Sequence, residues 1–442
     1  MPALHARADN LMQEIPTKAA FALYRLAWGI GLPFLRHNPR LSQGYHQRCF
    51  RSQLPMPADL WLQAASVGES YLAIELLARL RSYRPLRALV TTNTRQGKDV
   101  LEQTLGSHTP SGGNLHVAAA YFPFDKPDIM NRAVARIAPR VAVLLESELW
   151  PAHLAALKQA GSAILVINGR MNAKSLKRYS LWPSFWHRLR PDKILAISAA
   201  DARRFGTLFG ADRVGEMSNI KFDRLDFESE PSTDSNPLAP LFTPETRLVV
   251  LGSVRGAEEA SVREIVLELH RRQPEIVIGL FPRHIERVGR WSSFLSDRRM
   301  PWQLRSRIDQ AVAPGTVVLW DVFGELGHAY RLAIAAFVGG SLAPLRGQNF
   351  LEPLASGIRP VIGPSWEDFH WVGAEIIESG LVRVAQDWRQ TAQWLTEEIS
   401  RPADRSAIRL QAREYVRNRQ GGSDRACRLI QAYLDRKEPK NS

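Results

Sequence analysis

Cysteine is scarce in this chain, which has two in 442 residues, Cys49 and Cys427. They lie far apart, show no metal-binding spacing and imply no disulfide framework. Long hydrophobic runs are also lacking. The apolar segment Ala19–Leu35 contains Arg25. It is too short, and too often interrupted by glycine and proline, to be assigned as a membrane span. It lacks the basic start and cleavage site of a signal peptide. We expect a protein of a reducing compartment.

Acidic residues are in deficit: 44 Asp and Glu face 58 Lys and Arg, giving a net charge of +14 and a pI near 10.1. Such a balance suits nucleic acid, anionic lipid or a phosphorylated substrate. Several arginines follow the apolar segment Ala19–Leu35, among them Arg36, Arg40, Arg48 and Arg51. An apolar helix with trailing cations is typical of an anchor on an anionic surface. The alternative is a helix packed on its own domain, and the two are compatible.

Short apolar runs alternate with helical patterns in two series. This alternation predicts parallel sheets in two Rossmann-like domains, with ligands held at the carboxyl ends of the strands and a cleft between the domains. The predicted strands are Leu60–Ala65, Arg87–Thr92, Val117–Phe122, Val141–Leu145, Ala163–Ile167 and Ile194–Ile197, then Leu248–Gly252, Ile276–Leu280, Val317–Leu319, Ile334–Val338 and Pro360–Ile362. The predicted parts are an N-terminal membrane-associating segment (1–50), a first domain (51–227), a Pro- and Ser-rich linker (228–245), a second domain (246–402) and a C-terminal helical segment (403–442).

Carboxylates follow two strands of the first series. Ser66, Gly68 and Glu69 form a Ser-x-Gly-Glu turn after the first strand, where Glu69 can take a proton from an attacking hydroxyl. The same residues fit a capping box, with Ser66 as N-cap, and the pattern alone favours that interpretation. Glu146 and Glu148 follow the fourth strand, just before Trp-Pro. Two carboxylates at the carboxyl end of a strand slightly favour a functional site over a structural role.

The stretch from Arg170 to Pro191 has no acidic residue. It carries Arg170, Lys174, Lys177 and Arg178 among its cations, with aromatic residues interleaved. A charge run is usually a solvated face, but the interleaving equally favours a phosphate-bearing amphiphile or a membrane surface. Single-stranded nucleic acid would also fit this segment locally.

The second series contains a glycine turn. The strand Ile334–Val338 runs into Gly339, Gly340 and Ser341, where backbone amides can approach a ligand because Cβ atoms are absent. Asn349 and Glu352 follow near a helix start, a suitable place for ribose or sugar hydroxyls. This arrangement predicts a nucleotide-sugar pocket.

Further candidates end the neighbouring strands. Arg283 and His284 follow Ile276–Leu280, where an arginine can hold a phosphate through two parallel hydrogen bonds. Ser253 ends the strand before.

Taken together, the chain resembles the 3-deoxy-manno-octulosonic acid (Kdo) transferases of lipopolysaccharide assembly. The matching blocks occur in order over nearly the whole chain. They are Ser66–Glu69, Thr91–Gly97, Pro123–Asp125, Glu146–Pro151, Asn168–Arg170, Asp201–Phe205, Asn219–Asp223, Pro282–His284, Gly324–Leu326, Phe337–Ser341, Asn349–Pro353 and Gly363–Pro364.

The resemblance implies a GT-B glycosyltransferase that transfers Kdo from CMP-Kdo to a lipid A precursor, with inversion and without metal or cofactor. It implies a place on the cytoplasmic face of the inner membrane and no nucleic-acid partner. It also places the family's base at Glu69. The implied donor-binding residues are Ser253, Arg283, His284, Gly339, Gly340, Ser341, Asn349 and Glu352. The implied acceptor-binding residues are Ser66, Gly68, Glu146, Glu148, Arg170, Lys174, Lys177, Arg178 and Lys221.

The chain departs from the family pattern mainly on the donor side. Gln348 stands where the family has histidine before Asn349, and Val254-Arg255-Gly256-Ala257 replaces Thr-His-Glu-Gly. The missing histidine keeps open a GT-B enzyme that uses a UDP-sugar or another CMP-ulosonic acid. Two further alternatives are a non-catalytic lipid-binding paralogue and a nucleic-acid binder. Retention of Glu69, Arg283 and Glu352 argues against the non-catalytic paralogue. A nucleic-acid binder would explain the charge but not the paired domains.

Overall fold

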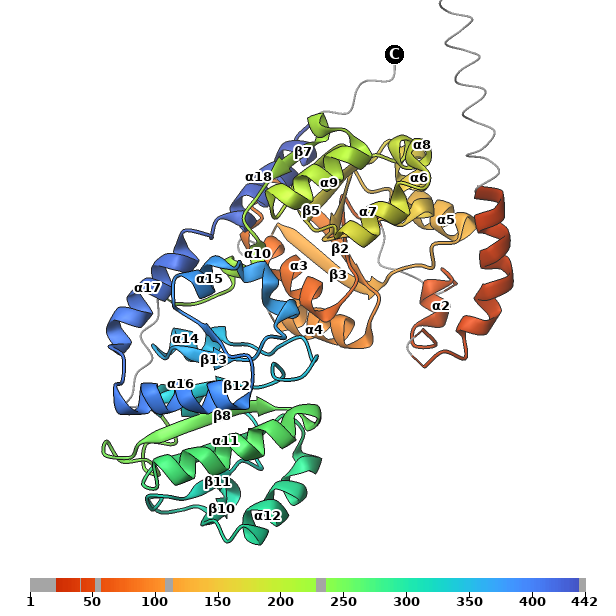
Figure 1. The fold of residues 1–442 in the computed structure, drawn as a ribbon. Helices are drawn as coiled ribbons and strands as arrows, with labels where there is room; N and C mark the ends of the chain where they lie inside the picture. The colour runs from red at the N-terminus through yellow and green to blue at the C-terminus, as the bar shows by residue number, and fades with distance from the viewer. Residues whose placement is uncertain (1–20, 40, 52–56, 108–113, 228–235, 437–442) are drawn as a thin grey trace, which may run out of the picture. The chain divides into compact units, whose positions relative to one another are not determined.

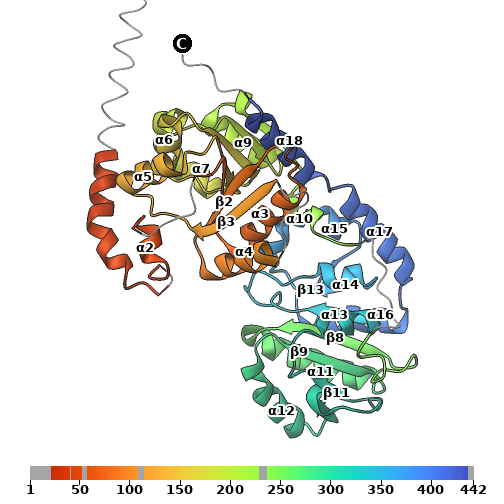
Figure 2. The same cartoon turned by 180° about the vertical axis from the view of Figure 1, so that it is seen from behind.

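A computed structural model describes residues 21–39, 41–51, 57–107, 114–227 and 236–436. The chain divides into two compact units. Unit 1 comprises residues 1–224 and 419–442, and unit 2 comprises residues 225–418 (Figures 1 and 2). Each unit is built around one seven-stranded parallel sheet.

The sheet of unit 1 has the order β3-β2-β1-β4-β5-β6-β7. Every pairing in it is parallel, so the carboxyl ends of all seven strands lie at one edge. The strands are β1 (Leu60–Ala64), β2 (Leu86–Thr92), β3 (Leu115–Tyr121), β4 (Val141–Leu145), β5 (Ala163–Gly169), β6 (Lys193–Ala196) and β7 (Val214–Glu216).

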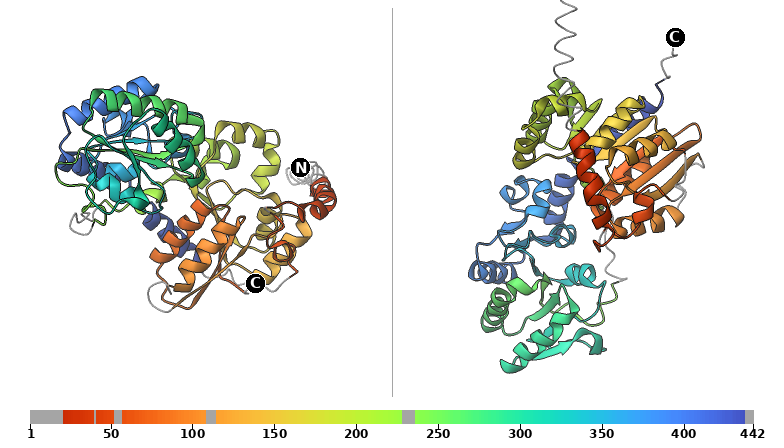
Figure 3. Two further views of the ribbon diagram at one scale, coloured as in Figure 1. Left: turned by 90° about the horizontal axis from the view of Figure 1, so that it is seen from below. Right: turned by 90° about the vertical axis from the view of Figure 1, so that its right-hand side faces the viewer.

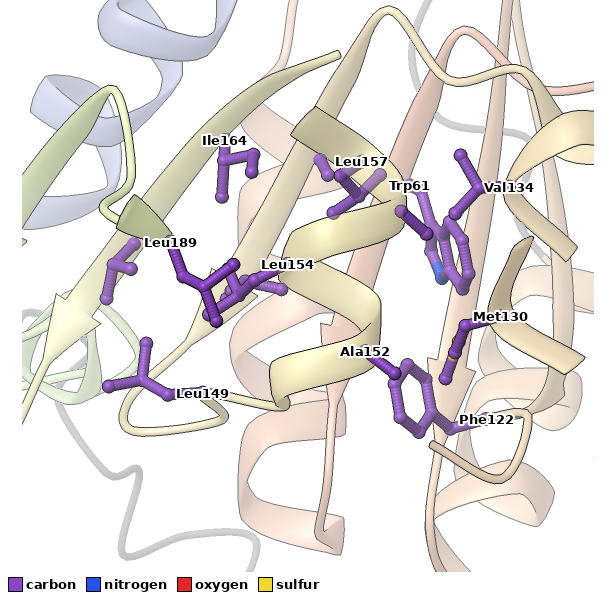
Figure 4. Packing of buried hydrophobic residues seen from close by; sticks show 14 of the residues in the cluster. Trp61, Phe122, Met130, Val134, Leu149, Ala152, Leu154, Leu157, Ile164 and Leu189 are labelled. Carbon is purple, nitrogen blue, oxygen red and sulfur yellow. The ribbon is translucent and has the colours of Figure 1, made fainter. Parts of the chain in front are cut away.

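Helices cover both faces of this sheet. After the helix near the N-terminus, the helices of unit 1 in the described residues are α2 (Tyr45–Arg48), α3 (Val67–Arg79), α4 (Arg95–Ser107), α5 (Pro127–Ile137), α6 (Pro151–Gln159), α7 (Ala173–Tyr179), α8 (Pro183–Arg188), α9 (Ala199–Phe209), η1 (Ala211–Arg213), α10 (Ile220–Asp223) and α18 (Gly422–Leu434). Side chains of α5, α6, α8 and α9 pack on one face of the sheet; Figure 4 shows this core around Trp61, Leu154 and Leu157. Side chains of α3, α4 and α18 pack on the other face. The central strands β1, β4 and β5 are buried on both sides, which is why they read as largely apolar runs.

Unit 2 repeats this plan with the strand order β10-β11-β9-β8-β12-β13-β14, again parallel throughout. Its strands are β8 (Leu248–Val254), β9 (Val277–Pro282), β10 (Trp302–Leu304), β11 (Val317–Leu319), β12 (Ala335–Val338), β13 (Pro360–Ile362) and β14 (Arg383–Val384). Its helices are η2 (Gly256–Glu258), α11 (Glu259–Arg272), η3 (Ile285–Arg287), α12 (Val288–Asp297), η4 (Arg305–Arg307), α13 (Leu326–Leu332), α14 (Leu351–Ala355), η5 (Glu367–Val372), α15 (Glu375–Glu378), α16 (Trp388–Ser400) and α17 (Arg405–Arg417). Side chains of α11, α12 and α16 share one core with the sheet.

The predicted α/β class with two doubly wound parallel sheets is confirmed. All eleven predicted strands exist, but β7, β10 and β14 were missed. The C-terminal helical segment is two helices separated near Gly421, and they belong to different units: α17 lies in unit 2 and α18 in unit 1. Residues 228–235 of the predicted linker lie outside the described residues. Its last part is ordered on unit 2, where Leu238 and Phe242 are buried.

Residues 21–35 form the helix expected near the N-terminus; positions 19 and 20 lie outside the described residues. This helix, red in Figure 3, contacts the first turn of α5. The Tyr24 hydroxyl donates to buried Asp125 at 2.8 Å, and Arg25 pairs with Asp128 of α5 at 3.0 Å. Among the helices that the structure describes, none has both the length and the apolar character needed to cross a bilayer.

Candidate active site

Glu69 lies in the first turn of α3, directly after β1. Its Oε2 accepts from the Ala65 amide at 2.7 Å, and its Oε1 accepts from the Ser66 hydroxyl at 3.0 Å. The Ser66 hydroxyl in turn accepts from the Glu69 amide at 3.3 Å. Ser66 is therefore the N-cap expected from the sequence, but the capping box is incomplete, because the Glu69 carboxylate accepts from the amide of Ala65 and not from that of Ser66. The same contacts hold the carboxylate at the carboxyl edge of the sheet, so capping and a chemical role are compatible.

Two more carboxylates stand close to Glu69. Burial raises the pKa of Glu69 to about 8, and the charges of Glu148 and Glu146 add to this, against the hydrogen bonds from Ala65 and Ser66. Glu69 is 9 % exposed. A carboxylate with a pKa near neutrality is suited to accept a proton in a transition state.

The other two carboxylates are held by different partners. Glu148 accepts from the indole of Trp150 at 2.6 Å, and Lys221 of α10 pairs with Glu146 at 3.3 Å. Glu146 has φ 55°, a left-handed conformation that costs a non-glycine residue on the order of 1–3 kcal/mol. The structure thus brings together Ser66, Gly68, Glu69, Glu146, Glu148 and Lys221 from the predicted acceptor set.

The remaining acceptor candidates are Arg170, which lies between β5 and α7, and three residues of α7. The amide of Arg170 donates to the Glu146 carbonyl at 3.3 Å, which ties the start of the basic stretch to the carboxylates. Lys174, Lys177 and Arg178 follow on α7 and are exposed.

In unit 2, the backbone amides of the glycine turn bind a protein carboxylate, whereas the sequence predicted that they would approach a ligand. The amides of Gly340, Ser341 and Leu342 donate to the carboxylate of Glu258, as does the amide of Arg255 at 3.0 Å. Glu258 is 1 % exposed. The Gly340 and Ser341 amides, which we expected to face a donor phosphate, are thus used by a protein carboxylate.

The glycines of this turn are required by packing. A Cβ on Gly339 would lie 2.7 Å from Glu258 Oε1 and 2.8 Å from the Ser253 carbonyl oxygen. Ser253 itself has φ 58°, so the end of β8 is also in a left-handed conformation. Ser253 and Gly339 lie next to each other because β8 and β12 are neighbouring strands.

Arg283, Asn349 and Glu352 form a second group at the same edge. Asn349 Nδ2 donates to Glu352 Oε1 at 2.8 Å. Desolvation raises the pKa of Glu352, while the Asn349 hydrogen bond and the charge of Arg283 lower it. Arg283 and His284 are exposed at the end of β9, with the Arg283 amide bonded to the Val254 carbonyl at 2.8 Å. These side chains remain available to a ligand.

Sequence reasoning missed the role of Glu258 and the position of Arg255. A Cβ on Gly340 would lie 3.4 Å from Arg255 Cδ and 2.8 Å from Gln348 Cγ. Arg255 and Gln348 therefore flank the glycine turn together. The available signal was the pair Glu258–Glu259 just after β8, which reads as an ordinary helix start. Within the described ranges, no group of three or more His, Cys, Asp or Glu side chains could hold a metal ion.

Comparisons with a family model and with known proteins give the same description. Residues 39–224 match the family described as "3-Deoxy-D-manno-octulosonic-acid transferase (kdotransferase)". The 3-deoxy-D-manno-octulosonic acid transferase of Bordetella pertussis is 30% identical over 390 residues, 87% of this chain and 89% of that protein. The transferase of the same description from Haemophilus influenzae is 26% identical, over 91% of this chain and 93% of that protein.

A solved glycosyltransferase from Rickettsia africae shares the fold with a TM-score of 0.56 at 10% identity, over 86% of this chain and 100% of that one. The chain belongs to the 3-deoxy-D-manno-octulosonic acid transferase family of glycosyltransferases.

Proposed function

We propose that this protein transfers Kdo from CMP-Kdo to a hydroxyl of a lipid A precursor, with unit 1 holding the acceptor and unit 2 the donor. The observation that carries the proposal is 30% identity to a Kdo transferase over 87% of the chain. The site geometry supports it, because each sheet carries a polar cluster at its carboxyl edge, where doubly wound domains hold ligands.

In the proposed step, the acceptor hydroxyl oxygen bonds to the anomeric carbon of Kdo, and the bond from that carbon to the CMP phosphate oxygen breaks. CMP leaves with the bonding electron pair, and the hydroxyl proton passes to the Glu69 carboxylate. The raised pKa of Glu69 suits this role, since a base of pKa about 8 takes up a proton readily once it is ionised. The phosphate left on CMP is stabilised by a cation, for which Arg283 is the candidate.

We place the acceptor's anionic groups near the exposed cations of α7, and the donor's hydroxyls near Asn349 and Glu352. We propose attachment to the cytoplasmic face of the inner membrane through the helix at 21–35. One face of this helix packs on unit 1 while the other exposes Leu23, Leu26, Ile30 and Phe34. Exposed apolar side chains beside cations are typical of a surface that lies on an anionic bilayer.

The test is incubation with radiolabelled CMP-Kdo and tetraacyl lipid A precursor, with the product mass determined. A mass increase by one or more Kdo residues supports the proposal. The Glu69→Gln variant, which should still bind CMP, is the matched control. No product with CMP-Kdo, but transfer from a UDP-sugar or another CMP-ulosonic acid, would overturn the donor assignment; the replacement at Gln348 is the observation that keeps this second candidate open.

A further inference from the structure

A groove of about 330 Å³ lies between the helix at 21–35 and the α7–α8 segment. Its lining is largely apolar and aromatic and includes Phe21, Tyr179, Leu181, Trp182 and Phe185. The aromatic rings are in contact, with Phe21 and Phe185 centroids 5.4 Å apart. Such a lining offers burial to hydrocarbon and few hydrogen bonds to a polar ligand.

The groove opens where apolar side chains are exposed. Leu181 is 82 % exposed and Trp182 40 %. The outer face of the neighbouring helix adds Leu23 at 67 %, Leu26 at 61 % and Phe34 at 70 %. Six of the eleven large exposed apolar residues in the described part of the chain lie on these two segments. A concentration of this kind marks a binding surface.

One cation lines the groove, and two more lie on the same helix. Arg178 lines it, with the guanidinium carbon 5.3 Å from the centroid of the Tyr179 ring. Lys174 and Lys177 lie on the same short helix, exposed, and the whole stretch 170–190 contains no acid to neutralise them. An apolar groove with an arginine in its lining complements an amphiphile that has an anionic head group and a hydrocarbon chain.

Two short connections join this groove to the Glu69 cluster. Pro151 lines the groove, and the adjacent Trp150 donates to Glu148. Arg170 bonds to the Glu146 carbonyl and begins the segment that forms the other wall. The walls of the groove are therefore connected directly to the segments that carry Glu146 and Glu148.

We propose that this groove binds one acyl chain of the acceptor lipid, with an anionic group of the same lipid at Arg178. The inference rests on the proposed function, because it assigns a subsite to the lipid acceptor. Burial of hydrocarbon out of water is favourable, so the groove makes acceptor affinity depend on acylation.

Leu181→Asp tests the groove, since it places a charge at the mouth on a side chain that is already largely exposed. Leu410→Asp is the matched control, at a leucine of α17 that is 64 % exposed in unit 2. Activity is measured with the acylated lipid A precursor and with the same glycan deacylated. We expect Leu181→Asp to raise KM for the acylated acceptor at least tenfold with kcat little changed, and to leave the deacylated acceptor unaffected. Leu410→Asp should match the parent with both.

Dodecyl phosphate, kept below its micelle concentration, gives a measurement independent of activity. The parent should bind it, and Leu181→Asp should bind it at least tenfold more weakly. Inorganic phosphate bound as tightly as dodecyl phosphate, or an unchanged acylated-acceptor KM in a folded Leu181→Asp protein, would overturn the proposal. A parent that transfers sugar to neither acceptor but binds dodecyl phosphate would instead overturn the proposed function alone.

Discussion

The base role of Glu69 predicts a pH dependence that the structure allows to be worked out. Its pKa is raised from 4.5 to about 8, mainly by burial and then by the charges of Glu148 and Glu146. A base must be ionised to act, so kcat/KM, which reports the free enzyme, should rise about tenfold per pH unit up to about pH 8 and then level. At pH 6, two units below that pKa, it should lie about 100-fold below the plateau.

Two substitutions test whether ionisation of Glu69 causes this pH dependence. Glu148→Gln removes a neighbouring negative charge, so the ionised form of Glu69 becomes easier to form and the midpoint should move to lower pH. Glu69→Gln should reduce turnover by about 10²–10⁴ and remove the rise with pH, while CMP binding persists. The assay is the initial rate of radiolabelled Kdo transfer at limiting acceptor from pH 5.5 to 9.5. A parent profile that is flat between pH 6 and 9, or Glu69→Gln turnover within a few-fold of the parent, would refute the reasoning.

The same shift carries a stability consequence. A carboxyl whose folded pKa lies above its unfolded value binds more protons when folded, so its contribution is full below about pH 4.5 and is lost as pH rises to about 8. The difference of 3.5 units corresponds to about 5 kcal/mol at 1.36 kcal/mol per unit, an upper bound because hydration and relaxation reduce it. Glu69→Gln should therefore raise Tm relative to the parent more at pH 9 than at pH 5. Equal Tm differences at the two pH values would contradict this.

Four further outcomes are expected. Arg283→Ala should weaken CMP binding by about 10-fold or more, as for loss of a charge-assisted hydrogen bond; unchanged affinity by calorimetry in a folded variant would place Arg283 elsewhere. Glu258→Ala should leave the buried amides of Ser341 and Leu342 without an acceptor at about 1–3 kcal/mol each, measurable as a lower midpoint in urea, whereas the neighbouring Glu264→Ala on α11 should change little. Activity should survive EDTA, and a strict Mg²⁺ requirement would favour a diphosphate-sugar donor. Sedimentation with anionic liposomes should fall with salt and drop when residues 19–35 are deleted or when Lys174, Lys177 and Arg178 become Ser; full binding by the combined variant would show that these segments are structural.

The local sequence was sufficient to predict most of the strands of both sheets. The buried strands β4, β11 and β13, none of which is an edge strand, were predicted to the residue, because strands covered on both faces need unbroken apolar runs. The Ser66–Glu69 turn was visible because an N-cap serine followed three residues later by glutamate is a local pattern. The strands β7, β10 and β14 were missed because they have two or three residues and lie at or near sheet edges, where burial imposes no such pattern.

Other features depended on residues far apart in the chain. Glu258 takes the amides of Gly340 and Ser341, 82 and 83 residues away, because β8 and β12 pair side by side. No local pattern could show that the glycine turn already holds a carboxylate. The raised pKa of Glu69 likewise required β1 and β4 to be neighbours, so that three carboxylates gather at one edge. Sequence by itself determined which segments become strands and where polar residues end them, whereas sheet order, a tertiary property, decided which of those residues meet.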